Sequence, residues 1–147
     1  TVNNEVSRLS SLGVMVVVAA GNEGRDASRT SPASATSAIT VGASTTSDRR
    51  TSWSNYGSVV DVYAPGDSIL SASYAGDSSY VRMSGTSMAS PGVAGHVACV
   101  LGAAPGSRCS SSDTVVGKIR NPRVVVSQLG GSKPLAYVAE GSRVSCP

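Results

Sequence analysis

The feature of this sequence that most constrains its fold is an uninterrupted run of apolar residues at positions 14–20. The run is rich in β-branched residues and has the length of a strand, which indicates a strand buried on both faces of a parallel sheet. Apolar residues recur at helical spacing over positions 2–12, and Gly13 follows as a helix stop. Helix, glycine and buried strand in this order predict an α/β fold with a mostly parallel sheet flanked by helices.

Length and charge exclude several classes of protein. The 147 residues suit about one domain, and low charge together with several Val-rich runs opposes disorder. No stretch of about 18 apolar residues is present, so we expect no membrane-spanning helix and no membrane partner. The net charge of +3 is too small and too scattered to favour binding to nucleic acid.

The abundance of Ser and Gly and the low charge suit a secreted, extracellular protein, in which a disulfide could persist. The three cysteines are an odd number. Cys99 lies in an apolar helical run, so we expect a buried free thiol there. Cys109 and Cys146 could pair with each other, but the sequence alone leaves that pairing open.

Strands are also predicted after the first apolar run. Short β-rich runs bounded by turn residues indicate strands at positions 39–42, 59–63, 69–73 and 80–83. A polar segment at 25–37, rich in Ser, Ala and Thr, indicates a loop between the first two strands.

A second helix is predicted over positions 86–103, where a Pro-Gly pair then ends it. Several small residues on this helix leave room for a neighbouring element to approach closely: Gly92, Ala94, Gly95 and Ala98. The sequence after position 107 gives weaker signals, which favour a helix near 112–119 and a strand at 124–126.

The first candidate for chemistry is Ser87, at the start of the helix predicted over 86–103. A nucleophilic serine needs exposure, a backbone that lets substrate approach, and stabilisation of the negative charge that forms on the attacked carbonyl oxygen. Gly85 has no side chain and so permits close approach, while the N–H groups and dipole at the helix start favour negative charge. A plain Ser/Thr helix cap in a Ser-rich chain is the alternative interpretation.

The second candidate is Asn22, which follows Ala19, Ala20 and Gly21 at the carboxyl end of the first predicted strand. Open parallel sheets bind ligands at this edge. A side-chain amide placed there could donate a hydrogen bond to an oxyanion, although a turn Asn with no chemical role has the same local sequence.

Taken together, these segments resemble the subtilisin-like serine proteases. Residues 85–91 with 93–95 resemble the nucleophile signature of that family, and 19–22 resemble its oxyanion segment. Further matches lie between them in the family's order: SPAS at 31–34, TVGA at 40–43, SNYG at 54–57 and APG at 64–66. The segments at 12–16 and 48–50 are most similar to the proteinase K branch. The resemblance is strongest over 2–101 and implies that 1–147 is the C-terminal part of one catalytic domain, within a three-layer fold.

The resemblance implies a role for each matching residue. Ser87 would be the nucleophile, and Asn22 would donate its amide to the oxyanion alongside the Ser87 backbone N–H. Gly85 would lie against substrate, and Ala19, Ala20 and Gly21 would form one wall of the pocket for the residue before the scissile bond. The partners implied are polypeptide substrates and a prodomain or protein inhibitor.

The resemblance implies no cofactor for catalysis but a structural calcium ion. The matching positions are the Asp61 carboxylate and the backbone carbonyls of Thr36 and Ala38. Asp61 lies between apolar residues, and a buried carboxylate needs a partner. A cation with oxygen ligands would be one, and a salt bridge or hydrogen bond would be another.

The family's pattern is incomplete in this chain. Its triad runs in the order Asp, His, Ser, and both the Asp and the His are expected upstream of position 1. His96 is the only histidine; it lies nine residues after Ser87 on the same predicted helix, a rise of roughly 13 Å, too far for a general base. Gly92 also stands where the family usually has a histidine.

These observations predict a fragment of a secreted serine endopeptidase that is inactive by itself. The alternative is a non-catalytic binding or regulatory module derived from the same family. Ser87 and Asn22 together favour the protease, because a module without the reaction has no chemical need of both.

Overall fold

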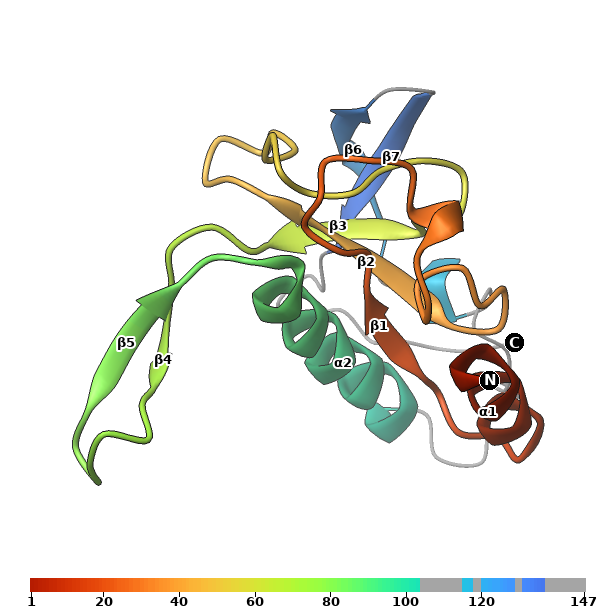
Figure 1. Cartoon of the computed structure of the whole chain (residues 1–147), viewed down its shortest axis with the longest axis horizontal. Coiled ribbons are helices and arrows are strands. Elements are labelled where there is room, and N and C mark those ends of the chain that lie inside the picture. The colour runs from red at the N-terminus through yellow and green to blue at the C-terminus, as the bar shows by residue number, and fades with distance from the viewer. Residues whose placement is uncertain (104–114, 118–119, 129–130, 137–147) are drawn as a thin grey trace.

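The computed structural model describes residues 1–103, 115–117, 120–128 and 131–136. Its main sheet has the strand order β1-β2-β3-β7-β6, with neighbours parallel except for the antiparallel pair β6 and β7. Helix α2 lies across one face of this sheet (Figure 1). The expected α/β fold with a mostly parallel sheet is therefore confirmed. The bounds of the strands are β1 Val17–Ala19, β2 Ile39–Ser44, β3 Val62–Pro65, β6 Arg120–Gln128 and β7 Gly131–Ala136.

Strand β1 is shorter and less buried than the apolar run predicted. Only Val17–Ala19 is strand, and only its central residue, Val18, is buried. Val14 is 46% exposed. Both faces of β1 are nevertheless covered, because Val17 packs against the cluster under α2 and Val18 packs with Val6 of α1. The run is less buried than predicted because pairing with β2 begins only at Val17, so Val14 precedes the sheet.

Strand β2 is the centre of the core, because all six of its residues are buried. Its side chains alternate between the two faces of the sheet, as the two-residue period of a strand requires. On one face, Ile39, Val41 and Ala43 pack against α2. On the other face, Gly42 lies directly under the ring of Tyr63 from β3, which is itself completely buried.

The third strand begins later than predicted. The apolar pattern indicated a strand at 59–63, whereas β3 runs from Val62 to Pro65. Residues 57–60 instead form a turn, in which Gly57 has a φ of 111° and the Val60 N–H donates to the Gly57 carbonyl at 3.2 Å. Val60 in that turn is buried although it does not belong to a strand. The apolar pattern therefore could not distinguish the buried turn from a buried strand.

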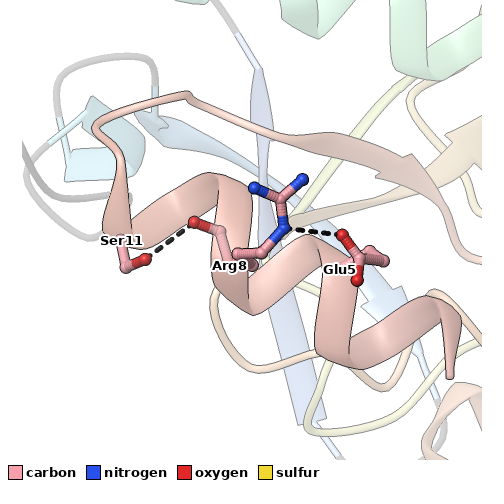
Figure 2. A network of polar contacts seen from close by, with 3 residues as sticks. All are labelled: Glu5, Arg8 and Ser11. Carbon is pink, nitrogen blue, oxygen red and sulfur yellow. Dashed lines mark hydrogen bonds and ion pairs between the residues drawn. The ribbon is translucent and has the colours of Figure 1, made fainter.

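Helix α1, Val2–Ser11, forms where predicted, but its apolar residues are unevenly buried. Val6 packs with Val18 of β1, whereas Val2 is 58% exposed. Arg8 donates from Nε to Glu5 Oε2 at 2.7 Å, and Ser11 Oγ donates to the Arg8 carbonyl at 2.7 Å (Figure 2). Both contacts lie on the exposed side of α1, where such pairs contribute little to stability.

Helix α2, Thr86–Ala103, has the predicted bounds. It packs against the sheet through Ala89, Val93, Val97 and Val100. Cys99 is exposed, so the expectation of a buried thiol was wrong. The reason is that Cys99 is one position away from the buried stripe, and a helix that packs on one face leaves such a position outside.

The small residues of α2 do not receive a close neighbour within the described part of the chain. A Cβ built on Gly92 or Gly95 meets nothing within 4 Å, and Ala94 and Ala98 are exposed. The expected close approach is thus absent there, because the helix turns its larger apolar residues toward the sheet.

Strands β4, Ile69–Ala72, and β5, Tyr80–Met83, form an antiparallel hairpin that projects away from the sheet (Figure 1). Both strands were predicted. The strand expected at 124–126 lies inside β6. Of the helix expected near 112–119, residues 115–117 are helical and the others lie outside the described residues. No helix in the described ranges is both long and apolar enough to cross a membrane.

Candidate active site

Ser87 occupies the second position of α2 and is exposed, while its neighbours Gly85 and Thr86 are buried. The turn before the helix is held by the Gly85 N–H, which donates to the Gly66 carbonyl at 2.8 Å. Gly66 must be glycine at this point, because an added Cβ would lie 2.7 Å from the Ala43 Cβ and 2.8 Å from the Gly85 carbonyl oxygen. Close packing against β2 therefore sets where the helix begins.

The structure brings Asn22 to the same helix start, although 64 residues separate it from Thr86. Its Oδ1 accepts hydrogen bonds from the Thr86 backbone N–H and from Thr86 Oγ1, each at 2.9 Å. Because Thr86 occupies the amide oxygen, the amide orientation is fixed and its Nδ2 hydrogens are directed elsewhere.

The fixed amide and the Ser87 backbone N–H border one small space beside Gly85. A Cβ built on Gly85 would lie 3.6 Å from Asn22 Nδ2 and 3.7 Å from Ser87 N, with Met88 Sδ also bordering the space at 3.4 Å. Both nitrogens are hydrogen-bond donors, and both lie near the positive end of the α2 dipole. An anionic oxygen in this space would be stabilised by both groups.

Thr86 has a larger part in this arrangement than the sequence indicated. Its side chain is completely buried, and besides donating to Asn22 its Oγ1 accepts the Gly21 N–H at 3.1 Å. One hydroxyl therefore connects the start of α2 to two consecutive residues after β1. Its position directly before Ser87 was the available signal, but its partners are distant in sequence.

The three residues expected to form a pocket wall lie differently from one another. Ala20 is completely buried in a cluster with Ala27, Ala33, Val60 and Tyr63, so its side chain lines no cleft and only its backbone could face a substrate. Ala19 and Gly21 are partly exposed. Gly21 has a φ of 102°, a conformation that favours glycine.

Thr36, Ala38 and Asp61 lie far from Ser87 in sequence but together line one pocket of about 210 Å³. Asp61 is half-buried rather than fully buried, and its Oδ2 accepts the Thr40 N–H at 2.8 Å. No cluster of three or more His, Cys, Asp or Glu side chains occurs within the described ranges, so a cation here would need backbone or hydroxyl oxygens as well. A carboxylate and neighbouring carbonyls are a suitable donor set for calcium.

His96 lies on α2 as predicted and is partly buried. Its Nδ1 is buried and has no hydrogen-bond partner among the described residues. Because Ser87 and His96 both lie on α2, nine residues apart, the helical rise separates them by roughly 13 Å along the axis, too far for His96 to act as the base for Ser87.

Comparisons with known proteins all point to the same family. The model of the subtilase family, Peptidase_S8, matches residues 1–123. The chain is 46% identical over 148 aligned residues to Subtilisin-like protease 1 of Pseudogymnoascus destructans, an alignment that covers 96% of this chain and 35% of the relative. It is 43% identical over 135 residues to Alkaline protease 1 of Aspergillus clavatus, covering 92% of this chain and 34% of that protein.

Solved structures agree with these relatives. The fold is similar to the crystal structure of a cold adapted subtilisin-like serine proteinase, with a TM-score of 0.81 and 38% identity. That match covers 94% of this chain and 50% of the other. The chain spans about a third of the length of the curated relatives it matches.

Proposed function

This chain belongs to the subtilase family, and on that premise we propose that the complete protein is a secreted serine endopeptidase with Ser87 as its nucleophile. The observation that carries the proposal is the pair of hydrogen bonds from Thr86 to Asn22 Oδ1. They leave Asn22 Nδ2 and the Ser87 N–H bordering one space beside Gly85, which is where a tetrahedral oxyanion would need its donors.

In the proposed reaction, Ser87 Oγ attacks the carbonyl carbon of a peptide bond and its proton passes to a histidine outside these 147 residues. The carbonyl oxygen becomes an oxyanion that accepts hydrogen bonds from Asn22 Nδ2 and Ser87 N. The C–N bond then breaks as the histidine gives the proton to the leaving amine, which leaves an acyl group on Ser87 Oγ. Water, deprotonated by the same histidine, hydrolyses this ester and restores the serine.

Asn22→Ala tests the oxyanion assignment. In subtilisin, losing the corresponding donor costs about 10²–10³ in kcat, a magnitude taken over here from that enzyme. We expect a fall in kcat of similar size in the full-length protein, with a small change in KM, because the donor acts mainly on the transition state. Hydrolysis of a chromogenic peptide gives both constants, and an unchanged kcat would remove Asn22 from the mechanism.

Labelling by a fluorophosphonate tests the nucleophile. The full-length protein should be labelled at Ser87, and Ser87→Ala should abolish labelling without loss of folded protein. Ser90→Ala is a matched control, because Ser90 lies one turn further along α2 and is only partly exposed. A folded, full-length protein that is not labelled would favour the non-catalytic module instead.

We also propose that the pocket lined by Thr36, Ala38 and Asp61 holds a structural calcium ion. Calcium there would connect the loop before β2 to the segment before β3 and would favour the folded state by mass action. Millimolar CaCl2 should raise the melting temperature of the wild-type protein but not that of Asp61→Asn. An equal shift in both would contradict this site.

A further inference from the structure

The turn that carries Asn22 is in contact with a second amide side chain, that of Asn55, which is completely buried. Its Oδ1 accepts the backbone N–H of Glu23 at 3.1 Å and that of Arg25 at 3.0 Å. Both donors belong to the turn after β1, and they lie just C-terminal to Asn22.

The amide nitrogen of Asn55 binds the same turn, including a residue that precedes Asn22. Its Nδ2 donates to the Ala20 carbonyl and to Glu23 Oε2, each at 2.8 Å. The Asn55 backbone N–H donates to the Gly21 carbonyl at 2.9 Å. Asn55 therefore binds residues both before and after Asn22 in the chain. No hydrogen bond joins the Asn22 and Asn55 amides to each other in the described part of the chain.

The contact between this amide and the turn is too close for a larger residue. A Cβ on Gly21 would collide with the Asn55 amide, and it would lie 2.7 Å from Glu23 Oε2. Because the Asn55 amide and the turn are in close contact, a displacement of the amide must displace the backbone of the turn.

Asn55 is itself held by its own loop. Arg50 Nη1 donates to the carbonyl oxygens of Thr51 at 2.9 Å and Ser54 at 2.6 Å. The Arg50 guanidinium also lies over the ring of Tyr56, 5.2 Å from its centroid. Arg50 therefore contacts the residues directly before and after Asn55, Ser54 and Tyr56.

We propose that Asn55 is a positioning residue that sets the place of Asn22 Nδ2 relative to Ser87 through the backbone of the turn. Thr86 binds the Asn22 side chain, and Asn55 binds the backbone of the residues on either side of Asn22. The inference rests on the proposed function, because it concerns the efficiency of the oxyanion donor.

Asn55→Asp in the full-length protein is the first test. This variant keeps the size and the acceptor oxygen of Asn55 but loses the Nδ2 hydrogens that bind Ala20 and Glu23. Misplacement by about 1 Å can cost about 10²-fold in rate, so we expect kcat to fall by about 10- to 100-fold with KM within about twofold. Thr51→Val is the matched control: Thr51 is also buried and lies in the same loop, but its hydroxyl makes no hydrogen bond within the described residues. It should leave kcat within about twofold.

A double-mutant cycle with Asn22→Ala separates positioning from general damage. If Asn55 acts through Asn22, Asn55→Asp should lower kcat by less than about threefold once the Asn22 amide is gone. The same fold-loss in both backgrounds overturns the positioning role while leaving the proposed function intact. If Asn22→Ala alone leaves kcat unchanged, the oxyanion assignment fails, and the inference fails with it.

Glu23→Ala gives the same test without a change in the core. Glu23 is exposed, so removing its carboxylate deletes one partner of Asn55 Nδ2 at little risk to folding. We expect kcat to fall about two- to fivefold, because the remaining hydrogen bonds still hold the turn. That loss should vanish in the Asn22→Ala background, and its persistence there would overturn the inference.

Discussion

At the scale of single residues, the candidate site depends on a few buried polar groups that have all their partners. Thr86 and Asn55 are both completely buried, and each binds the turn after β1. Buried polar groups are favourable only when hydrogen-bonded, and here those bonds are made to the backbone and to a candidate catalytic side chain. The hydrogen bonds that satisfy these buried groups therefore also fix the geometry of the candidate site.

Thr86→Val should weaken both stability and catalysis. The change keeps the shape of the side chain but leaves the Gly21 N–H and Asn22 Oδ1 without the hydroxyl. We expect the free energy of unfolding to fall by about 1–3 kcal/mol and kcat of the full-length protein to fall by about tenfold. Thr86→Ser, which keeps the hydroxyl, should restore most of kcat. Urea unfolding and peptide hydrolysis measure the two effects, and equal kcat losses in both variants would contradict this role.

Tyr63 should make the protein less stable at alkaline pH. Burial raises the pKa of its phenol well above the ordinary value of 10.0, with Arg50 opposing the shift. The unfolded chain therefore releases this proton first, near pH 10, while the native state keeps it. Stability is unaffected by this group below about pH 10 and falls as the pH rises beyond it, by at most about 1.4 kcal/mol per pH unit.

Tyr63→Phe is the variant that isolates this effect. It removes the ionisable group together with the polar contacts of the phenol, among them a 3.5 Å hydrogen bond to the Asn55 carbonyl. Urea midpoints compared at pH 8 and pH 11 should fall less in Tyr63→Phe than in the wild type. An identical fall would assign the alkaline loss to other groups.

At the scale of elements, the packing of β2 against β3 depends on one glycine. Gly42 lies under the Tyr63 ring, and an added Cβ would collide with that ring, lying 2.9 Å from Cζ. Both residues are in register across the two strands, so neither can move without breaking the ladder. The sequence TVGA marks this segment, but only the neighbouring strand shows why its third residue is glycine.

Gly42→Ala should lower the free energy of unfolding by about 1–3 kcal/mol, as overpacking of a tight core does. Gly95→Ala is the matched control on α2, where a Cβ meets nothing within 4 Å. It should raise stability by up to about 1 kcal/mol through helix propensity. Urea unfolding of the 147-residue chain, followed by its single Trp, measures both. A neutral Gly42→Ala would contradict the packing described.

At the scale of the whole molecule, the chain carries the proposed nucleophile and the proposed oxyanion donor but no histidine placed to act as the base for Ser87. It spans about a third of its curated relatives, and its one histidine is too far from Ser87 to act. On the proposed function, the arrangement around Gly85 is therefore one part of a site that needs a base from outside these 147 residues.

The isolated 147-residue chain should not be labelled by a fluorophosphonate, because no base activates Ser87 within it. Circular dichroism of the same sample establishes that it is folded, and the full-length protein serves as the positive control. Labelling of the folded isolated chain at Ser87 would overturn the view that the base lies outside it.

The fold could be predicted from sequence where a pattern is local. The bounds of α2 and β5 were predicted correctly because helical periodicity and short alternating runs are properties of neighbouring residues. The bounds of β1 and β3 and the exposure of Cys99 were predicted wrongly. Each of those depends on which neighbour covers a given face, and a single segment does not contain that information.

By itself the sequence determined the chemical groups of the site and the order in which the chain presents them: Asn22 after a strand, and Gly85 and Ser87 at the start of a helix. Only the tertiary structure decided how those groups face one another. Thr86 fixes the Asn22 amide across 64 residues, and Asn55 supports the turn from a separate loop. The physical reason is that hydrogen bonds between distant segments depend on the packing of the strands and helix that carry them, which no local pattern specifies.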